Sequence, residues 1–236
     1  MEDLRYIKNE NKFLDYSFDV LKKYFNNDRI VFDSFYNSIN SKEKKNKFLK
    51  IASFYKFLVV DGKFIVESNK PNAYIDYLDH TYKYIAIFSL IEDLYTEEEY
   101  KDFYSWLRSK ETGIKFPIED KNMLDILHEK YLDTHGSTQK AVRFFELLDD
   151  ETKKYTTDKL MIRKNGEIQP PLFVELAKLL YQIRNDFIHK AKLIAQFNVG
   201  TTIHTTQNKL IINSLDFETI KMIFGKGLLK FFGYQN

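Results

Sequence analysis

The chain has 236 residues, of which 44% are hydrophobic, 16% aromatic and 30% charged, and this composition excludes disordered and fibrous proteins and provides for a sizeable core. The chain has 36 lysines and arginines and 34 aspartates and glutamates, so its formal net charge is +2. This net charge is too small for the protein as a whole to attract a polyanion such as a nucleic acid. The sequence has no cysteine, which excludes disulfides, thiolate catalysis and cysteine-ligated metal centres.

The first residues, MEDLRYIKNENKF, show no apolar segment behind a basic end. No run of about 18 apolar residues occurs further along the sequence. We therefore expect neither a secretion signal nor a membrane span. With the absence of cysteine, this pattern favours a cytoplasmic location.

Helical periodicity dominates the first half of the chain. Apolar residues recur three and four positions apart over residues 13–25, over 41–58 and over 73–95. Ser41 is a suitable N-cap for the second of these helices.

Two further elements are expected in the first half. The β-prone runs of residues 57–66 flank Asp61-Gly62, a dipeptide favoured in tight turns, and predict a small hairpin. Thr96 and Glu99 form a capping-box pattern, which predicts a helix from there to Arg108.

Residues 109–120 contain a glycine and a proline and have no helical period. They are the best candidate for a boundary between two parts of the chain. We assign residues 1–118 to a helical N-terminal region without a readable motif, and residues 119–236 to a second helical domain.

The second half again follows the helical period. It predicts four helices, over residues 119–133, 138–149, 150–160 and 171–191. Ser137 is the expected cap of the second, and the prolines of Gln-Pro-Pro at 169–171 are expected in the first turn of the fourth. Residues 193–213, around Gly200, predict another hairpin, and a closing helix follows over 215–232. The fold class is mainly α: a helical bundle in the second half, small β-hairpin additions and a helical N-terminal region.

The segment LYQIRNDFIHKAK, residues 180–192, places several polar residues at the end of the fourth helix. At 100° per residue, the apolar side chains of this helix form one stripe, which contains Leu172, Leu176, Leu179, Leu180, Ile183 and Phe187. Asn185 and His189 lie one turn apart on the outer face, and Arg184 lies about 140° from His189. One straight helix cannot direct Arg184 and His189 at one atom. They converge if the guanidinium curls round, if the helix bends near Asp186, or if a second copy supplies the missing half across a two-fold axis.

The segment RNDFIH at 184–189 resembles the motif of the HEPN family, the higher eukaryote and prokaryote nucleotide-binding helical domains, in its common Arg-Asn-x-x-x-His form. The resemblance covers residues 119–236. It implies a helical homodimer that cleaves RNA without a metal or other cofactor, as many members do in toxin–antitoxin, phage-defence and RNA-guided systems. Other members have lost activity and serve as binding or dimerisation units. Ala191 stands where one toxin subgroup has a modified tyrosine, which puts that mode of regulation in doubt.

The chemistry of these residues suits RNA cleavage. Internal cleavage needs a base for the ribose 2′-hydroxyl, an acid for the leaving oxygen and positive charge over the phosphorane oxygens. Histidine performs the first two near neutral pH, and the planar fork of arginine grips phosphate oxygens. The resemblance assigns His189 as general acid/base, Arg184 as transition-state clamp and Asn185 as a positioning group.

Residues around the motif are candidates for RNA binding. Lys178, Lys190 and Lys192 flank it and would form the local positive patch that the global charge does not show. Tyr181, near 180° on the wheel, is expected to be exposed and to stack on a base. Asp186 flanks the apolar stripe, where a structural ion pair or cap is favoured over catalysis.

The other histidines do not predict a metal site. His80 follows Asp76 by one turn without a further ligand. His128 and His135 are seven residues apart and could share a face, but His135 lies at what looks like the end of a helix, where a cationic imidazole offsets the dipole. His204 lies among threonines, where RNA contact competes with plain exposure.

The leading hypothesis is a metal-independent endoribonuclease in a toxin or phage-defence system, with RNA as substrate, a homodimeric site and an antitoxin or other defence protein as partner. The alternatives are a non-catalytic dimerisation or partner-binding module, and a protein that binds RNA without cleaving it.

Overall fold

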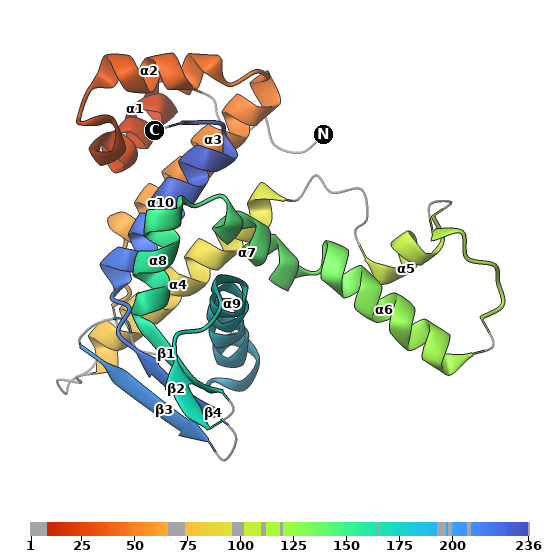
Figure 1. Ribbon diagram of the computed structural model, residues 1–236. Coiled ribbons are helices and arrows are strands. Elements are labelled where there is room, and N and C mark those ends of the chain that lie inside the picture. The colour runs from red at the N-terminus through yellow and green to blue at the C-terminus, as the bar shows by residue number, and fades with distance from the viewer. Residues whose placement is uncertain are drawn as a thin grey trace.

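The computed structural model describes residues 9–65, 74–95, 102–109, 112–118, 120–164, 166–192, 197, 200–206 and 209–235, with only the backbone of 74–77, 206 and 209. Most of these residues are helical, and four short strands form one antiparallel sheet. The expectation of a mainly α fold with small β additions is therefore confirmed (Figure 1).

The N-terminal region is a series of helices. Its elements are α1 (Glu10–Leu21), the 3₁₀ turn η1 (Lys22–Phe25), α2 (Arg29–Ser38), α3 (Lys42–Phe54), the π-helical η2 (Tyr55–Val60) and α4 (Tyr74–Leu94). The side chains of Asn9, Asp28 and Ser41 accept backbone N–H groups and cap α1, α2 and α3. The cap at Ser41 is thus confirmed, whereas α2 was not predicted.

The hairpin predicted over residues 57–66 is wrong. Residues up to Val60 continue the preceding helix, and residues 61–65 have no regular structure, while residue 66 lies outside the described residues. The Asp61 N–H donates to the Lys56 carbonyl, five residues back, which is the bond of a π-turn. The Lys56 ammonium also binds the carboxylates of Asp19 and Asp61, and this holds the last helical turn against α1.

Helices α5 (Phe103–Leu107) and α6 (Lys121–His135) form a unit of their own, packed round the small cluster of Trp106, Leu107 and Leu127. Figure 1 shows them extending away from the other helices. The prediction of one helix from residue 96 to Arg108 is wrong, because the backbone of Asp102 is extended and Asp102 is the N-cap of α5. The capping-box pattern of Thr96 and Glu99 lies outside the described residues.

The helices of the second half match their predicted ranges closely. They are α7 (Ser137–Glu146), α8 (Asp150–Asp158), α9 (Phe173–Lys190) and α10 (Phe217–Phe231), following α6. Two cap assignments are wrong. The residue before α7 is Gly136, and Ser137 is already helical. The two prolines precede α9 and do not lie in its first turn. The N-cap of α9 is Leu172, whose backbone N–H donates to the Glu175 carboxylate.

The sheet has the strand order β2-β1-β4-β3, from β1 (Leu160–Lys164), β2 (Glu167–Gln169), β3 (Thr202–Thr206) and β4 (Lys209–Asn213). A hairpin within the predicted range 193–213 is confirmed as β3–β4, although both of its strands follow Gly200, around which it was predicted. The hairpin β1–β2 was not predicted, although Asn-Gly at 165–166 is a strong turn signal and Gly166 has a φ of +87°.

The core crosses the proposed boundary near residue 118, because one buried cluster contains side chains of α2, α3 and α4 together with those of α7, α9 and α10. Buried tyrosines bond across it: the Tyr84 hydroxyl donates to the Leu180 carbonyl and the Tyr55 hydroxyl to that of Lys221. Gly227 lets the buried Phe144 ring lie against α10, where a Cβ would collide with it. The division at residue 118 remains a prediction.

Asp149 joins α8 to α10. Its carboxylate caps α8 by accepting the Thr152 N–H at 2.7 Å, and it binds the Lys226 ammonium of α10 at 3.1 Å. Burial alone raises its pKa, but the bonds from Thr152 and Lys226 outweigh burial and lower the pKa to about 2 from 3.8.

Because the folded pKa of Asp149 is depressed, its stabilisation is present above about pH 4 and is lost as the pH falls towards 2. We expect Asp149→Asn, which retains a capping side chain, to flatten the fall of the unfolding free energy over this pH window. Denaturant unfolding between pH 2 and 7 measures this change. Asp150→Asn, one residue later, is the matched control, and an equal flattening in both variants would contradict the assignment.

No helix in the described part of the chain is long and apolar enough to cross a membrane.

Candidate functional site

Helix α9 carries the predicted site residues and is held by a deeply buried face. Leu176, Leu180 and Ile183 are buried, as the helical period predicts. Leu172 departs from the predicted stripe, since it precedes the first turn and is 68% exposed. The apolar face thus fixes which way the polar residues of α9 point.

The helix is uninterrupted from Phe173 to Lys190, so no break near Asp186 turns Arg184 and His189 towards each other. It ends because Ala191 adopts a left-handed conformation with φ of +50°, and its N–H donates to the Phe187 carbonyl. His189 therefore lies in the last turn, where its side chain is exposed.

Arg184 is turned towards α4, and its side chain is only 14% exposed. Its Nη1 donates to Asn185 Oδ1 at 2.9 Å, its Nη2 lies 3.5 Å from Glu92 Oε1, and the Tyr181 ring lies 5.5 Å from the guanidinium carbon. Its Nε is buried and has no hydrogen-bond partner among the residues that the structure describes. The guanidinium thus already has one carboxylate partner within the chain.

Tyr181 is not on the surface, and the expectation of an exposed ring is wrong, because it is 4% exposed. Its hydroxyl donates to Glu92 Oε1 at 2.6 Å, and its ring packs on Phe88. Burial and then the bond to Glu92 raise the pKa of Tyr181 to about 12. The helical wheel placed Tyr181 outside the stripe, but α4 covers that side of α9.

The outer side of α9 carries a polar row. Lys178, Asn185 and His189 fall within about 40° of one another on a straight helix, and Lys178 and His189 are exposed while Asn185 is partly so. One amide, one imidazole and one ammonium therefore face the same way. Arg184 lies about 140° from His189 on this helix, so a single copy separates the phosphate clamp from the acid/base.

The carboxylate of Asp186 is bonded to one lysine and lies near a second. It binds the Lys190 ammonium at 2.8 Å and accepts a bond from the Gln182 amide at 3.0 Å, in keeping with the ion-pair role predicted for it. The bond from Lys190 lowers the pKa of Asp186, with a smaller electrostatic contribution from Lys192. Two cations with one anion leave the end of α9 with a net positive charge.

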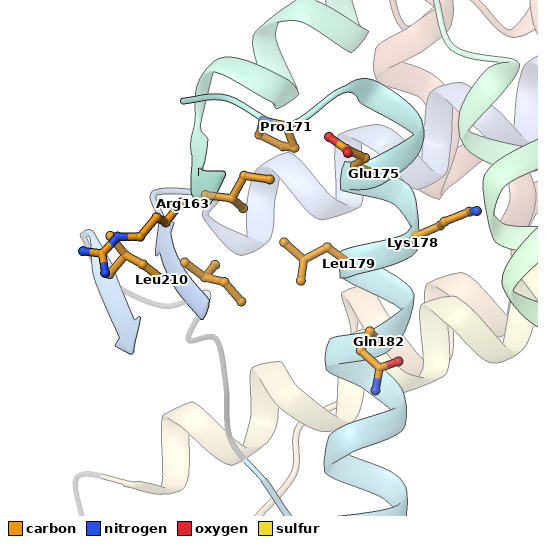
Figure 2. Close-up of a pocket in the computed structure, with 9 residues that line it drawn as sticks. Arg163, Pro171, Glu175, Lys178, Leu179, Gln182 and Leu210 are labelled. Carbon is orange, nitrogen blue, oxygen red and sulfur yellow. The ribbon is translucent and has the colours of Figure 1, made fainter. Parts of the chain in front are cut away.

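A cleft lies between α9 and the sheet, with a volume of about 460 Å³. Its walls are mainly apolar and include Ile162, Leu179 and Leu210. In Figure 2, Leu179 points towards the sheet, while the charged ends of Arg163 and Lys178 point away from the centre. Of the labelled charged side chains, Glu175 alone turns towards the Pro171 side of the cleft, and its carboxylate is bound by Lys164, so charged groups do not converge there as they do in typical small-ligand sites.

Three of the four other histidines contact aromatic rings, and the fourth, His204, is half-buried in β3. His80 stacks on Phe217 with ring centroids 4.9 Å apart, and His128 and His135 pack against the aromatic side chains of α5 and α6. Within the described ranges, no three histidines or acidic side chains gather closely enough to hold a metal ion. That the chemistry proceeds without a metal remains a prediction from the residue types.

Sequence reasoning missed Glu92, which ties Arg184 and Tyr181 to α4. We expect Glu92→Ala to lower the unfolding free energy by about 1–3 kcal/mol, because it removes two bonds and leaves Arg184 without its counter-ion. Denaturant unfolding measures the change, with the exposed Glu129→Ala as control. A change below about 0.5 kcal/mol, the usual limit for surface substitutions, would contradict a structural role for this contact.

Comparison of the chain with protein-family models, with curated proteins and with solved structures yields no match.

Proposed function

We propose that the chain is a metal-independent endoribonuclease of HEPN type, whose site combines Arg184 and His189 from two copies. The observation that carries the proposal is the segment RNDFIH at the exposed end of an uninterrupted amphipathic helix. Arg184 and His189 point in different directions on this helix, so one copy cannot direct both side chains at the same phosphate. A complete site therefore needs the Arg184 of one copy and the His189 of the other. A two-fold axis near the end of α9 would bring the two sets together.

In the proposed reaction, the ribose 2′-oxygen attacks the adjacent phosphorus and the bond to the 5′-oxygen breaks. One His189 accepts the proton of the 2′-hydroxyl, and the other His189 donates a proton to the leaving 5′-oxygen. Arg184 stabilises the charge that develops on the non-bridging oxygens, and Asn185 positions the guanidinium to which it is already bonded. The products are a 2′,3′-cyclic phosphate and a 5′-hydroxyl end.

The test is to incubate the purified chain with varied RNAs in EDTA and to analyse the product ends. We expect cleavage that resists EDTA, gives the cyclic phosphate and depends on His189. RNA that remains intact over a wide range of protein concentration would contradict the proposal, as would equal rates with and without His189.

The second candidate is a non-catalytic module that forms dimers or binds a partner protein. The bonds of Arg184 to Glu92 and Asn185 favour it, because an arginine engaged within the fold has less freedom to grip a phosphate. This candidate predicts a dimer that weakens on substitution of His189, without turnover of RNA. Binding of RNA without cleavage would instead show a steep salt dependence.

The biological setting that accompanies the proposal is a toxin or phage-defence system with a partner protein that restrains or activates the chain. This setting rests on the resemblance of the motif. Co-purification with the product of an adjacent gene would test it.

A further inference from the structure

Three aromatic rings from three separate segments of the chain form a row on the surface beside the end of α9. Phe64, which follows η2, stacks on Tyr82 of α4 with centroids 4.4 Å apart and planes 28° apart. Tyr82 in turn meets Phe187 of α9 edge to face at 5.8 Å. Phe64 and Tyr82 are 37% and 45% exposed, so the two stacked rings form a contiguous exposed apolar patch.

The aromatic row is held in place by bonds beneath it. The Phe64 N–H donates to Asp79 Oδ1 at 2.6 Å, and the Asp79 carboxylate binds Lys83 at 2.7 Å on the same helix. The segment that carries Phe64 is thereby fixed to α4 next to Tyr82. A ligand that stacks on these rings meets a preformed surface and loses little affinity to ordering it.

Along the chain, a lysine lies next to each end of the row. Lys63 adjoins Phe64, is exposed and forms no ion pair with the described residues. Lys190 is one turn from Phe187 and binds the Asp186 carboxylate, which Lys192 also influences electrostatically. Flat rings between cations suit a strand that offers both a planar base and phosphates.

We propose that the row of Phe64, Tyr82 and Phe187 stacks an unpaired base of single-stranded RNA, and that Lys63 and Lys190 contact the phosphates on either side. This inference rests on the proposed function and specifies its substrate as single-stranded, because the bases of a duplex are stacked inside it and offer no free face.

A second copy of the chain suits this surface less well. A two-fold contact places the same patch of each copy against the other, so the lysines at its ends would face like charges. The polar row with His189 lies on the other side of α9, about one helix diameter of 10–12 Å away. The stacked base therefore belongs to a nucleotide a few positions from the scissile phosphate.

The experiment measures binding of a labelled 2′-O-methyl RNA strand, which lacks the attacking hydroxyl and cannot be cleaved, by fluorescence anisotropy. We expect Tyr82→Ala to weaken binding about 5- to 150-fold, the equivalent of one stacked base. Phe64→Ala should act in the same direction from a different element. Tyr82→Phe retains the ring and should bind as the wild type does, as should Tyr104→Ala, which removes an exposed tyrosine of α5.

Wild-type affinity in Tyr82→Ala would overturn the inference, as would a wild type that does not bind the strand. A third outcome would also overturn the inference: in sedimentation, Tyr82→Ala turns a dimer into a monomer while the RNA affinity stays unchanged. The aromatic row would then be a contact between two copies of the chain. Cleavage of ordinary RNA together with unchanged binding by Tyr82→Ala would reject the stacking surface alone. Tyr82-dependent binding without any cleavage would reject the nuclease and support the stacking surface.

Discussion

RNA cleavage by the His189→Ala variant should be slower than that of the wild type by about 10²–10⁴-fold, the usual contribution of a general acid or base. In the proposed dimer the substitution removes the base and the acid together, because each copy supplies one imidazole. We therefore expect the loss towards the upper end of this range. Single-turnover rates on one RNA, measured in EDTA at several protein concentrations, separate this loss from weaker dimerisation.

His189 is a clean position for this test because its side chain is exposed in the last turn of α9. Its removal should change the unfolding free energy by less than about 0.5 kcal/mol. Arg184 is a poorer probe, since its guanidinium is largely buried and bonded to Asn185 and Glu92. His128→Ala, which removes an exposed histidine of α6, is the matched control and should cleave as the wild type does. Equal rates for both variants and the wild type would refute catalysis by His189.

The helical period predicted α9 well because the burial of that helix follows its own sequence. Leu176, Leu180 and Ile183 recur every three or four residues, and each is buried where the period places it. Tyr181 shows the limit of the same reasoning. A wheel contains one helix only, whereas the burial of Tyr181 depends on Glu92 and Phe88, which α4 brings to that side.

Turn dipeptides proved less reliable than helical periods. Asp61-Gly62 lies between β-prone runs, yet the residues before it remain helical, with Tyr55 and Val59 buried and Lys56 paired with Asp61 and Asp19. Asn-Gly at 165–166 marks a real hairpin that went unpredicted. A dipeptide allows a tight turn, but partners elsewhere in the fold determine whether strands form on both sides of it.

The motif residues could be found from sequence, but their contacts could not. Arg184, Asn185 and His189 stand out because polar residues interrupt the end of an amphipathic helix. Glu92, Phe64 and Tyr82 show no such signal, since each belongs to an ordinary helical or apolar run. Their relevance comes from tertiary contacts alone, and no spacing rule connects them with α9.

Phe88→Ala should lower the free energy of unfolding by about 3–5 kcal/mol, as is usual when a large aromatic side chain is removed from a core. Phe88 is 1% exposed and contacts Tyr84 of its own helix, Phe145 of α7 and Tyr181 of α9. Three helices meet at this ring, so the cavity left behind cannot close by a shift of one side chain. Denaturant unfolding at neutral pH measures the loss.

Two further variants provide comparisons for the loss of unfolding free energy in Phe88→Ala. Phe88→Leu leaves a smaller cavity and should cost clearly less than alanine, whereas Tyr104→Ala, at an exposed aromatic position, should cost less than about 0.5 kcal/mol. Because α9 is packed through Tyr181 against Phe88, the alanine variant should also disturb the position of Arg184 and Glu92. A loss below about 1 kcal/mol would fall well short of the range for such cavities, and would mean that α4, α7 and α9 do not meet at Phe88.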